Sequence, residues 1–420
     1  MKVHRSHPRR SACALVCSLV LGGFTPNISS ALTLDEALRI AEAQAPSLNA
    51  QTADVELARS MAKPANQLPD PKLLLGLNNF PISGDNRGEL NAEPMTMQMV
   101  GISQEVTNSD KRQARVAMAQ ATIETAQAQR QIERLNVRLQ TALAWISARA
   151  TEQKLQLFKQ LYSENKLFAA AIRASIAGGQ GQSADSVAPR QEALLLAEQQ
   201  DSLEQERSQQ RAALRRWIGE DARQPLTGKL PQWQPAPAQF SHALEQHPEL
   251  AVYEPMGRQA DAAISAAVAE KQPDWAWQVA YQKRGADFGD MVSVQFSVDL
   301  PVFAGSRQDP KIAASHSARN RLDAQREAKL RQHRQQLDDL QAQYHRLDRA
   351  VERSQSQLIP LAVDKVQLSL ADYRAGKNQL ANLINARREL IEARLRDIDL
   401  QQQRSLVSAN LHYAYTEISQ

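Results

Sequence analysis

Hydrophobic residues recur every three or four positions through a long segment that runs from residue 111 to 177. Neither glycine nor proline interrupts this segment. The spacing of one helix face is clearest at Ile132, Leu135, Leu139, Leu143 and Ile146. A helix of this length extends roughly 100 Å, far beyond the helices of compact domains. The pattern therefore predicts a rod that crosses a compartment.

A glycine-rich break follows the predicted rod at residues 178–181. Ser183 or Asp185 can cap a new helix there, and the pattern predicts a return helix over residues 187–217. The two helices form a helical hairpin. The next stretch, residues 224–237, is rich in proline and lacks periodicity, so it is typical of a surface linker.

The second half of the chain repeats landmarks of the first half at offsets between 195 and 206 residues. Ala37, Leu38, Pro46 and Leu48 match Ala243, Leu244, Pro248 and Leu250, while Arg112, Gly179, Arg190 and Glu192 match Arg307, Gly376, Arg387 and Glu389. Two copies of one supersecondary unit explain this order. We expect a first repeat over residues 32–223, a linker over 224–238 and a second repeat over 239–420.

Before the second long helix the hydrophobic period changes from three or four to two, which indicates β-strands. The apolar positions are Trp275, Trp277, Val279, Tyr281, Val292, Val294, Phe296 and Val298. The polar positions between them include Gln278, Gln282, Ser293, Gln295 and Ser297. Apolar side chains toward lipid and polar side chains toward a lumen are typical of a water-filled transmembrane barrel.

The first half contains a weaker version of these strands. Leu73, Leu75 and Leu77 alternate with Leu74, Gly76 and Asn78, and Met95, Met97 and Met99 alternate with Thr96, Gln98 and Val100. Two hairpins make four strands. Four strands cannot close a barrel, and open sheet edges are not tolerated in lipid, so several subunits must share one barrel.

The N-terminus has the composition of a secretory signal. Lys2, Arg5, Arg9 and Arg10 precede an apolar run over residues 11–24 that is too short to span a bilayer, and small residues precede Leu32. We therefore expect residues 1–31 to be a signal peptide. It holds four of the 50 basic residues and none of the 46 acidic ones, so the remaining chain has a formal net charge of zero. This balance excludes the basic surface of a nucleic-acid binder.

Cysteines and helical membrane spans are both absent from the predicted mature sequence. Cys13 and Cys17 lie in the signal, which leaves no disulfide and no thiolate metal ligand. Ala14, Leu15 and Val16 before Cys17 do not match a lipoprotein signal, so lipidation is not expected. No later segment approaches 20 apolar residues, and any membrane crossing must use strands.

This duplicated plan resembles that of TolC-type outer-membrane efflux proteins over residues 32–420. The resemblance implies a mainly α fold with a small β part: a homotrimer with a twelve-stranded barrel in outer-membrane lipid and a coiled-coil tunnel through the periplasm. It also implies two partners, a periplasmic adaptor protein and an inner-membrane resistance-nodulation-division pump. The function expected is a passive exit duct in the cell outer membrane.

Within that family, residues 67–71 leading to 79–81, and 95–97 leading to 101–105, are similar to the heavy-metal branch. This similarity implies a proton-driven pump and cargo such as copper, silver, cobalt, zinc or cadmium cations. Drugs, peptides or a secreted protein remain alternative cargoes. A periplasmic adaptor is an alternative of another class, but an adaptor has no need of the apolar strand face.

The resemblance also assigns roles at the far end of the helices. Adaptor docking maps to the periplasmic tips, at Gly179, Gly181, Ser183, Asp185, Gly376, Asn378 and Leu380. A gate that attracts cations maps to Asp364, Asp372, Tyr373 and Arg374. An ordinary solvated helix face explains these last four residues equally well.

Other candidates for chemistry have simpler explanations. Met95, Met97 and Met99 can bind soft cations, but we assign them to the apolar face and favour lipid contact. His316, His333 and His345 are spread along one predicted helix, which favours solvated surface residues over a metal site. Pro360 predicts a kink or break in the second long helix. No catalytic motif emerges, so we expect no catalytic residue, cofactor or bound metal.

Overall fold

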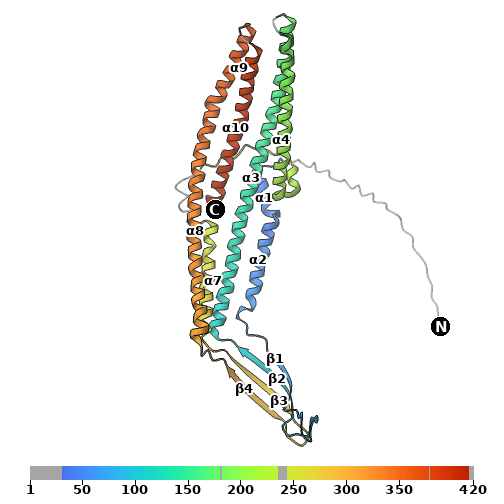
Figure 1. Ribbon diagram of the computed structural model, residues 1–420, viewed down its shortest axis with the longest axis vertical. Helices are drawn as coiled ribbons and strands as arrows, with labels where there is room; N and C mark the ends of the chain where they lie inside the picture. Colours follow the sequence, from blue (N-terminus) through green and yellow to red (C-terminus); the bar gives the residue numbers. More distant parts are fainter. Residues whose placement is uncertain (1–30, 180–181, 235–243, 378, 416–420) are drawn as a thin grey trace, which may run out of the picture.

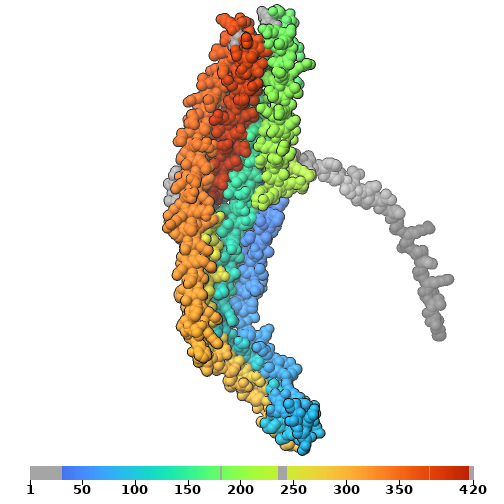
Figure 2. All heavy atoms as spheres, viewed as in Figure 1, coloured from blue at the N-terminus to red at the C-terminus, as the bar shows by residue number. Residues whose placement is uncertain are grey.

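The computed structural model describes residues 31–179, 182–234, 244–377 and 379–415. The molecule is a long, narrow and slightly curved body in which helices run side by side and a small sheet lies at one end (Figures 1 and 2). The hairpin turns between the helices lie at the opposite end from the sheet (Figure 1). Among the described helices, none is both long enough and apolar enough to cross a membrane.

The first half builds one long helical hairpin and two strands. Its elements are α1 (Leu34–Gln44), α2 (Pro46–Ala62), the 3₁₀ turn η1 (Lys63–Asn66), β1 (Lys72–Asn78), β2 (Met97–Val106), α3 (Ser109–Ala177), the 3₁₀ turn η2 (Ser183–Val187), α4 (Ala188–Ile218) and the 3₁₀ turn η3 (Gly219–Arg223). Helix α3 has 69 residues and is about 100 Å long, which confirms the predicted rod. It begins at Ser109 because the side chain of Asn108 accepts a hydrogen bond from Lys111 N at 2.8 Å.

The second half contains the same kinds of element in a similar order. These are α6 (Pro248–Ala251), α7 (Tyr253–Ala269), β3 (Trp275–Lys283), β4 (Met291–Val298), α8 (Ala304–Arg353), the π turn η4 (Ser354–Leu358), α9 (Ile359–Arg374) and α10 (Leu380–Tyr415). Pro360 lies in the first turn of α9, directly after the π turn. The helix widens there instead of breaking, because the π turn accommodates a residue that has no N–H to donate. A common origin of the two halves stays a prediction.

The four strands form one antiparallel sheet in the order β1-β2-β3-β4. This confirms two hairpins that meet along β2 and β3. One row of paired residues runs Leu75, Val100, Tyr281 and Val292 across the sheet. Residues that pair directly share a face, so this row and its neighbours at steps of two define an apolar face.

The register corrects the prediction for the methionines. Met95 precedes β2, while Met97 pairs with Asn78 and Met99 pairs with Gln282. Met97 and Met99 therefore lie on the polar face, and Val100 and Ile102 take the apolar face. The prediction was wrong because β2 carries apolar residues on both faces, so that alternation alone cannot orient it. Pairing with β3 decides the orientation.

The core is a set of narrow seams between helices, and the largest seam surrounds the buried Trp145. The Trp145 indole donates a hydrogen bond to Leu32 O at 3.2 Å. Leu32 forms a parallel bridge with Leu226, and both Leu226 and Leu230 are buried. The predicted surface linker therefore packs into the core over its described part, because these two leucines fill the seam.

Candidate functional site

The apolar face of the sheet is exposed on all four strands. Its exposed members are Leu73, Leu75, Leu77, Val100, Ile102, Trp275, Val279, Tyr281, Val292, Val294, Phe296 and Val298, and Trp277 is half-buried. All eight residues that the sequence predicts for a lipid face therefore lie on this one face. So large a continuous apolar surface marks contact with a membrane or with another protein.

The opposite face of the sheet is polar and has small residues at its centre. Gly101 pairs with Ala280, and Ala280 pairs with Ser293. A Cβ atom on Gly101 would lie 2.8 Å from the Ala280 Cβ, so only glycine fits this close approach. Gly101 therefore leaves room for the Ala280 side chain at the centre of this face.

The residues predicted for a barrel lumen all lie on this polar face. Gln278 pairs with Gln295, Gln282 follows four residues later on β3, and Ser293 and Ser297 flank Gln295 on β4. Gln282 donates a hydrogen bond to Ser293 Oγ at 3.2 Å. The structure brings these five side chains onto one surface, with Met97 and Met99 beside them.

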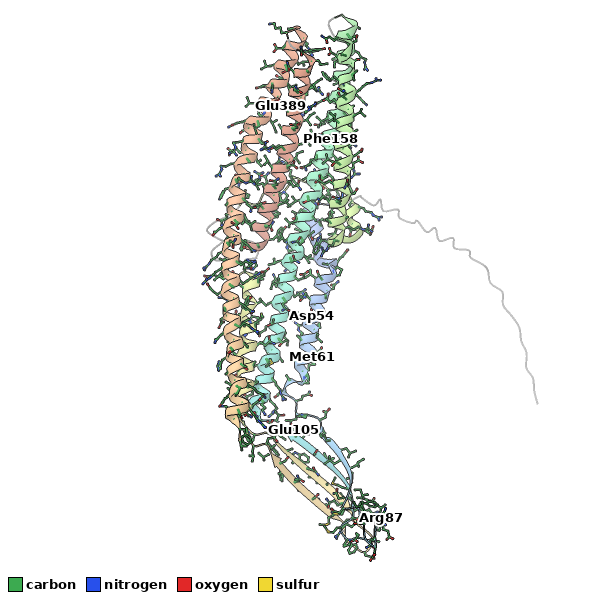
Figure 3. The ribbon with its side chains drawn as sticks, in the orientation of Figure 1. Asp54, Met61, Arg87, Glu105, Phe158 and Glu389 are labelled. Carbon is green, nitrogen blue, oxygen red and sulfur yellow. The ribbon has the colours of Figure 1, made fainter. Side chains whose placement is uncertain are left out.

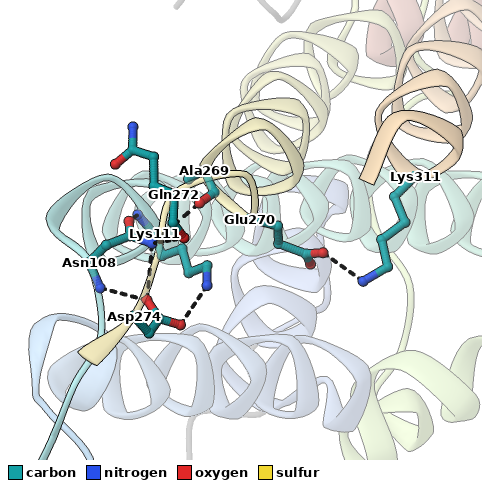
Figure 4. A network of polar contacts seen from close by, with 7 residues as sticks. All are labelled: Asn108, Lys111, Ala269, Glu270, Gln272, Asp274 and Lys311. Carbon is teal, nitrogen blue, oxygen red and sulfur yellow. Dashed lines mark hydrogen bonds and ion pairs between the residues drawn. The ribbon is translucent and has the colours of Figure 1, made fainter. Parts of the chain in front are cut away.

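A polar network fixes the sheet to the helices. Asp274, directly before β3, accepts hydrogen bonds from Asn108 N at 2.8 Å and from Lys111 Nζ at 2.5 Å (Figure 4). Burial alone would raise the pKa of Asp274, but these two partners hold it below its usual value. A second ion pair joins Glu270 and Lys311 at 2.6 Å (Figure 4). The network links the first half, through α3, to the second half, through α7, β3 and α8.

Both helical tips turn on a glycine with a left-handed backbone, Gly179 with φ 77° and Gly376 with φ 72°. Asp185 accepts a hydrogen bond from Gln182 N at 3.1 Å, and Ser183 begins the 3₁₀ turn that follows. Gly181 and Asn378 lie outside the described residues. Leu380 is buried in a cluster with Phe168 and Ile172 of α3, so its side chain lies in the seam between the two hairpins and not on an exposed docking surface.

The predicted gate residues do not form a cluster in the described part of the chain. Asp364, Asp372 and Arg374 are exposed along α9, and in the described part of the chain no ion pair joins them to each other. Tyr373 is half-buried and packs in the seam between the two hairpins. A gate built from these residues would need neighbouring subunits.

Sequence reasoning missed a buried ion pair near the tips. Arg387 Nε on α10 lies 3.6 Å from Glu192 Oε1 on α4, with side chains that are 16% and 12% exposed. The guanidinium of Arg387 also lies 4.7 Å from the centre of the Phe168 ring. The pair ties one hairpin to the other. Both residues occur among the landmarks that the two halves of the sequence share, and this repetition is the sequence feature that could have indicated their importance.

A second buried cluster overturns the prediction for His333, although His316 and His345 are exposed as expected. His333 is buried because α6 and the end of α10 cover it. Its ring centre lies 4.1 Å from that of His247, and its Nε2 lies 3.2 Å from Glu249 Oε2. Tyr415 contacts the same histidine at 3.3 Å.

The electrostatics of this cluster favour the neutral form of His247. Burial, with a further contribution from His333, lowers the pKa of His247 to about 4. A hydrogen bond from His333, and then Lys329 at 2.5 Å, lower the pKa of Glu249 to about 2. Glu249 N donates to His247 Nδ1 at 3.2 Å, so neutral His247 caps α6. Among the described residues, no group of three His, Cys, Asp or Glu can hold a metal ion.

The two ends of the elongated molecule thus carry the candidate functional surfaces, and these surfaces lie far apart. Arg87 lies in the loop beyond the strands, whereas Glu389 lies on α10 toward the tips (Figure 3). The end with the sheet offers a large apolar surface, and the other end offers two glycine turns.

No protein-family model matches this sequence, and none of the curated proteins matches it significantly. Solved structures do match the fold. A membrane protein from Pseudomonas aeruginosa aligns with a TM-score of 0.76 and 19% identity over 91% of this chain and 93% of that one. The outer membrane protein VceC from Vibrio cholerae aligns with a TM-score of 0.74 and 16% identity over 91% and 95%. The open state of the Neisseria gonorrhoeae MtrE outer membrane channel aligns with a TM-score of 0.73 and 18% identity over 91% and 88%. The chain therefore has the fold of outer-membrane channels.

Proposed function

We propose that this protein is the outer-membrane exit duct of an efflux pump that spans the cell envelope. The observation that carries the proposal is the exposed apolar face of the sheet, set at the end of a helical body about 100 Å long. In the outer membrane, lipid acyl chains cover this apolar face, and the helices then extend through the periplasm. An N-terminal signal peptide without lipidation exports the chain.

Closure of the barrel requires more than one copy. Strands β1 and β4 are the two edges of the sheet, and a lipid-exposed edge would leave backbone groups without partners. Pairing β4 of one copy with β1 of the next removes both edges. Three copies give twelve strands, which agrees with the resemblance to the TolC-type family, and the polar face of the sheet then lines the interior of the barrel.

The duct is passive, and the pump in the inner membrane supplies the energy. A periplasmic adaptor docks at the turns around Gly179 and Gly376, which extend farthest from the membrane. Asp364, Asp372, Tyr373 and Arg374 of neighbouring copies form the gate that docking opens. The chain has no role as an enzyme in this scheme.

For the cargo we propose heavy-metal cations, carried by a proton-driven resistance-nodulation-division pump. The support is the similarity of residues 67–81 and 95–105 to the heavy-metal branch. Drugs are the second candidate, since a water-filled conduit does not select its cargo. We expect that replacing Met95, Met97 and Met99 with leucine leaves metal export intact, because a wide conduit does not need to coordinate each ion.

Complementation of a deletion strain tests the proposal. Growth is measured across copper, silver, zinc, cobalt, cadmium and several lipophilic drugs, with the intact gene, with Val294→Arg on the apolar face and with Gln295→Arg on the polar face. Rescue from metals by the intact gene and by Gln295→Arg, but not by Val294→Arg, supports the heavy-metal duct. Rescue from drugs alone retains the duct and rejects the metal cargo. Equal rescue by Val294→Arg contradicts the membrane assignment of the sheet.

A further inference from the structure

The apolar alternation of β4 continues beyond the end of the strand. The strand ends at Val298, yet Leu300 and Val302 keep the same two-residue step and are 72% and 71% exposed. Phe303 follows with 63% exposure. They belong to the segment that connects β4 to α8, at the end of the sheet nearest the helices (Figure 1). Asp299, between Val298 and Leu300, belongs to the other set of alternating positions, which forms the polar face.

The length of β4 explains why this extension matters. Eight residues span about 27 Å, and a strand tilted by about 45° then covers only about 19 Å of membrane depth. The apolar band of a transmembrane barrel is about 25 Å tall. Asp299 N still donates to Asp274 O at 2.8 Å, so two further residues, up to Leu300, extend the apolar face to about 23 Å. The chain then turns, because Val302 N donates to Leu300 O at 2.9 Å, and Val302 and Phe303 lie on this turn at the edge of the face. The segment after β4 therefore completes the band on the side toward the helices.

A cation lies at the end of this segment. The guanidinium of Arg307, on the first turn of α8, lies 5.7 Å from the centre of the Phe303 ring. Arg307 is exposed, and among the described residues it forms no ion pair. An aromatic ring beside a long cationic side chain is typical of the membrane–water interface, where the ring lies at the headgroup level and the cation reaches phosphate.

We infer that Leu300, Val302, Phe303 and Arg307 form an interfacial anchor in the phospholipid leaflet that faces the periplasm. The three apolar side chains enter the acyl boundary, and Arg307 binds the phosphate of a phospholipid headgroup. This inference rests on the proposed function, since it takes the sheet to span the membrane. The competing occupant is a second copy of the chain, because β4 is an edge strand.

Site-directed fluorescence tests the anchor in the assembled protein. Both natural cysteines lie at positions 13 and 17, within the predicted signal peptide, so Val302→Cys gives a single labelling site in the exported chain. The labelled protein is reconstituted into vesicles of phosphatidylethanolamine and phosphatidylglycerol that carry spin labels either at the headgroup or deep in the acyl chains. Phe296→Cys reports on the sheet, and Ser317→Cys, about 20 Å along α8 from Phe303, reports on the helical body.

The anchor predicts that the label at position 302 loses most of its emission to headgroup spin labels and less to deep ones. The label at position 296 should respond more to deep spin labels, and the label at 317 to neither. If the label at position 296 is quenched and the label at position 302 is not, the anchor hypothesis is wrong, but the proposal that the sheet spans the membrane is retained. A neighbouring copy as occupant would shield position 302 from lipid and from aqueous quenchers alike. If 296 is also not quenched, the proposed function fails.

Charge reversal tests the role of Arg307. In the Val302→Cys background, Arg307→Glu should reduce quenching by headgroup spin labels, because a carboxylate is repelled by phosphate, whereas Arg307→Lys should preserve it. Arg321→Glu, an exposed position farther along α8, is the matched control. Equal quenching in Arg307→Glu and the unchanged background would overturn the assignment of Arg307 to a headgroup.

Discussion

Phe158 and Phe296 show how differently the two ends of this molecule treat the same side chain. Phe158, on α3, is 1% exposed and packs in a seam between helices (Figure 3). Phe296, on β4, is 68% exposed and belongs to a continuous apolar face. In water the second arrangement is unfavourable, so a membrane or another protein must cover the apolar face of the sheet.

The helical body and the sheet also differ in how they obtain stability. The helical body is narrow, so few side chains in each seam are fully buried, and each of them contributes a large share of the free energy of unfolding. In the described part of the chain, no apolar layer packs against the sheet. Its stability comes from strand pairing and from the polar network at its base. Stability of the body is thus internal, whereas the sheet depends on its surroundings.

The largest expected effect separates these two regions directly. Phe158→Ala leaves a cavity in a tight seam and should lower the free energy of unfolding by about 3–5 kcal/mol. Phe296→Ala removes a side chain that one subunit does not bury, and its effect should stay below about 1 kcal/mol for the helical body. Thermal unfolding of the purified protein, followed by helical circular dichroism, measures both. Equal losses for the two variants would contradict the contrast.

A charge on the sheet gives the next largest effect. Val294→Arg, near the middle of the apolar face, should cost about 2–4 kcal/mol in lipid. The matched variant Gln295→Arg places the same charge on the polar face and should assemble normally. The measurement is the fraction of protein that inserts into vesicles as a heat-resistant oligomer. Similar insertion of both variants would show that the face does not contact lipid.

Acid should destabilise the helical body through His247. Its pKa falls from 6.5 in the unfolded chain to about 4 in the folded one, so the unfolded chain binds more protons between these values. The free energy of unfolding should therefore decrease as the pH falls from about 6.5 to 4, by on the order of 2–3 kcal/mol. Glu249 acts in the same direction at lower pH, because its pKa is lowered to about 2. The basic side chains that face Glu249 and His247 from α8 are Lys329 and His333.

A non-titrating cap sharpens this test. His247→Asn keeps a side-chain acceptor for Glu249 N and should flatten the pH dependence above about 4. His316→Asn, at an exposed position, should leave the dependence unchanged. Unfolding is measured from neutral pH downward for all three proteins. A slope that persists in His247→Asn would assign the proton uptake to another group.

The sequence predicted the elements whose periodicity is long or strict. Residues 111–177 lacked any interruption, and β3 and β4 alternated without exception, so both the rod and the second hairpin were correct. The faces of β2 were assigned wrongly because Met99 and Val100 are both apolar. Only the pairing of β2 with β3, which joins residues about 180 positions apart, resolves that choice.

The burial of isolated residues could not be predicted from the sequence for a similar reason. His333 lies on a helix whose other predicted histidines are exposed, and it is buried because residues from α6 and α10 cover it. Leu226 and Leu230 lie in a proline-rich stretch without periodicity, yet they fill the seam near Trp145. Such contacts depend on distant segments that local patterns do not encode. The ion pair of Glu192 and Arg387 belongs to the same class.

The smallest expected effect compares ion pairs at the two ends. Lys111 and Asp274, at the base of the sheet, have side chains 19% and 14% exposed, whereas Lys365 and Glu389, toward the tips, are 56% and 52% exposed. Double-mutant cycles to alanine should give a coupling of about 1.5–3 kcal/mol for the first pair, since it is a charged hydrogen bond shielded from water. The second pair should give at most about 0.5 kcal/mol, because water screens it. Raising the salt concentration should weaken the second coupling more than the first. Equal couplings with equal salt dependence would mean that the base of the sheet is no better shielded than the tips, and the polar network would then not be what holds the sheet to the helices.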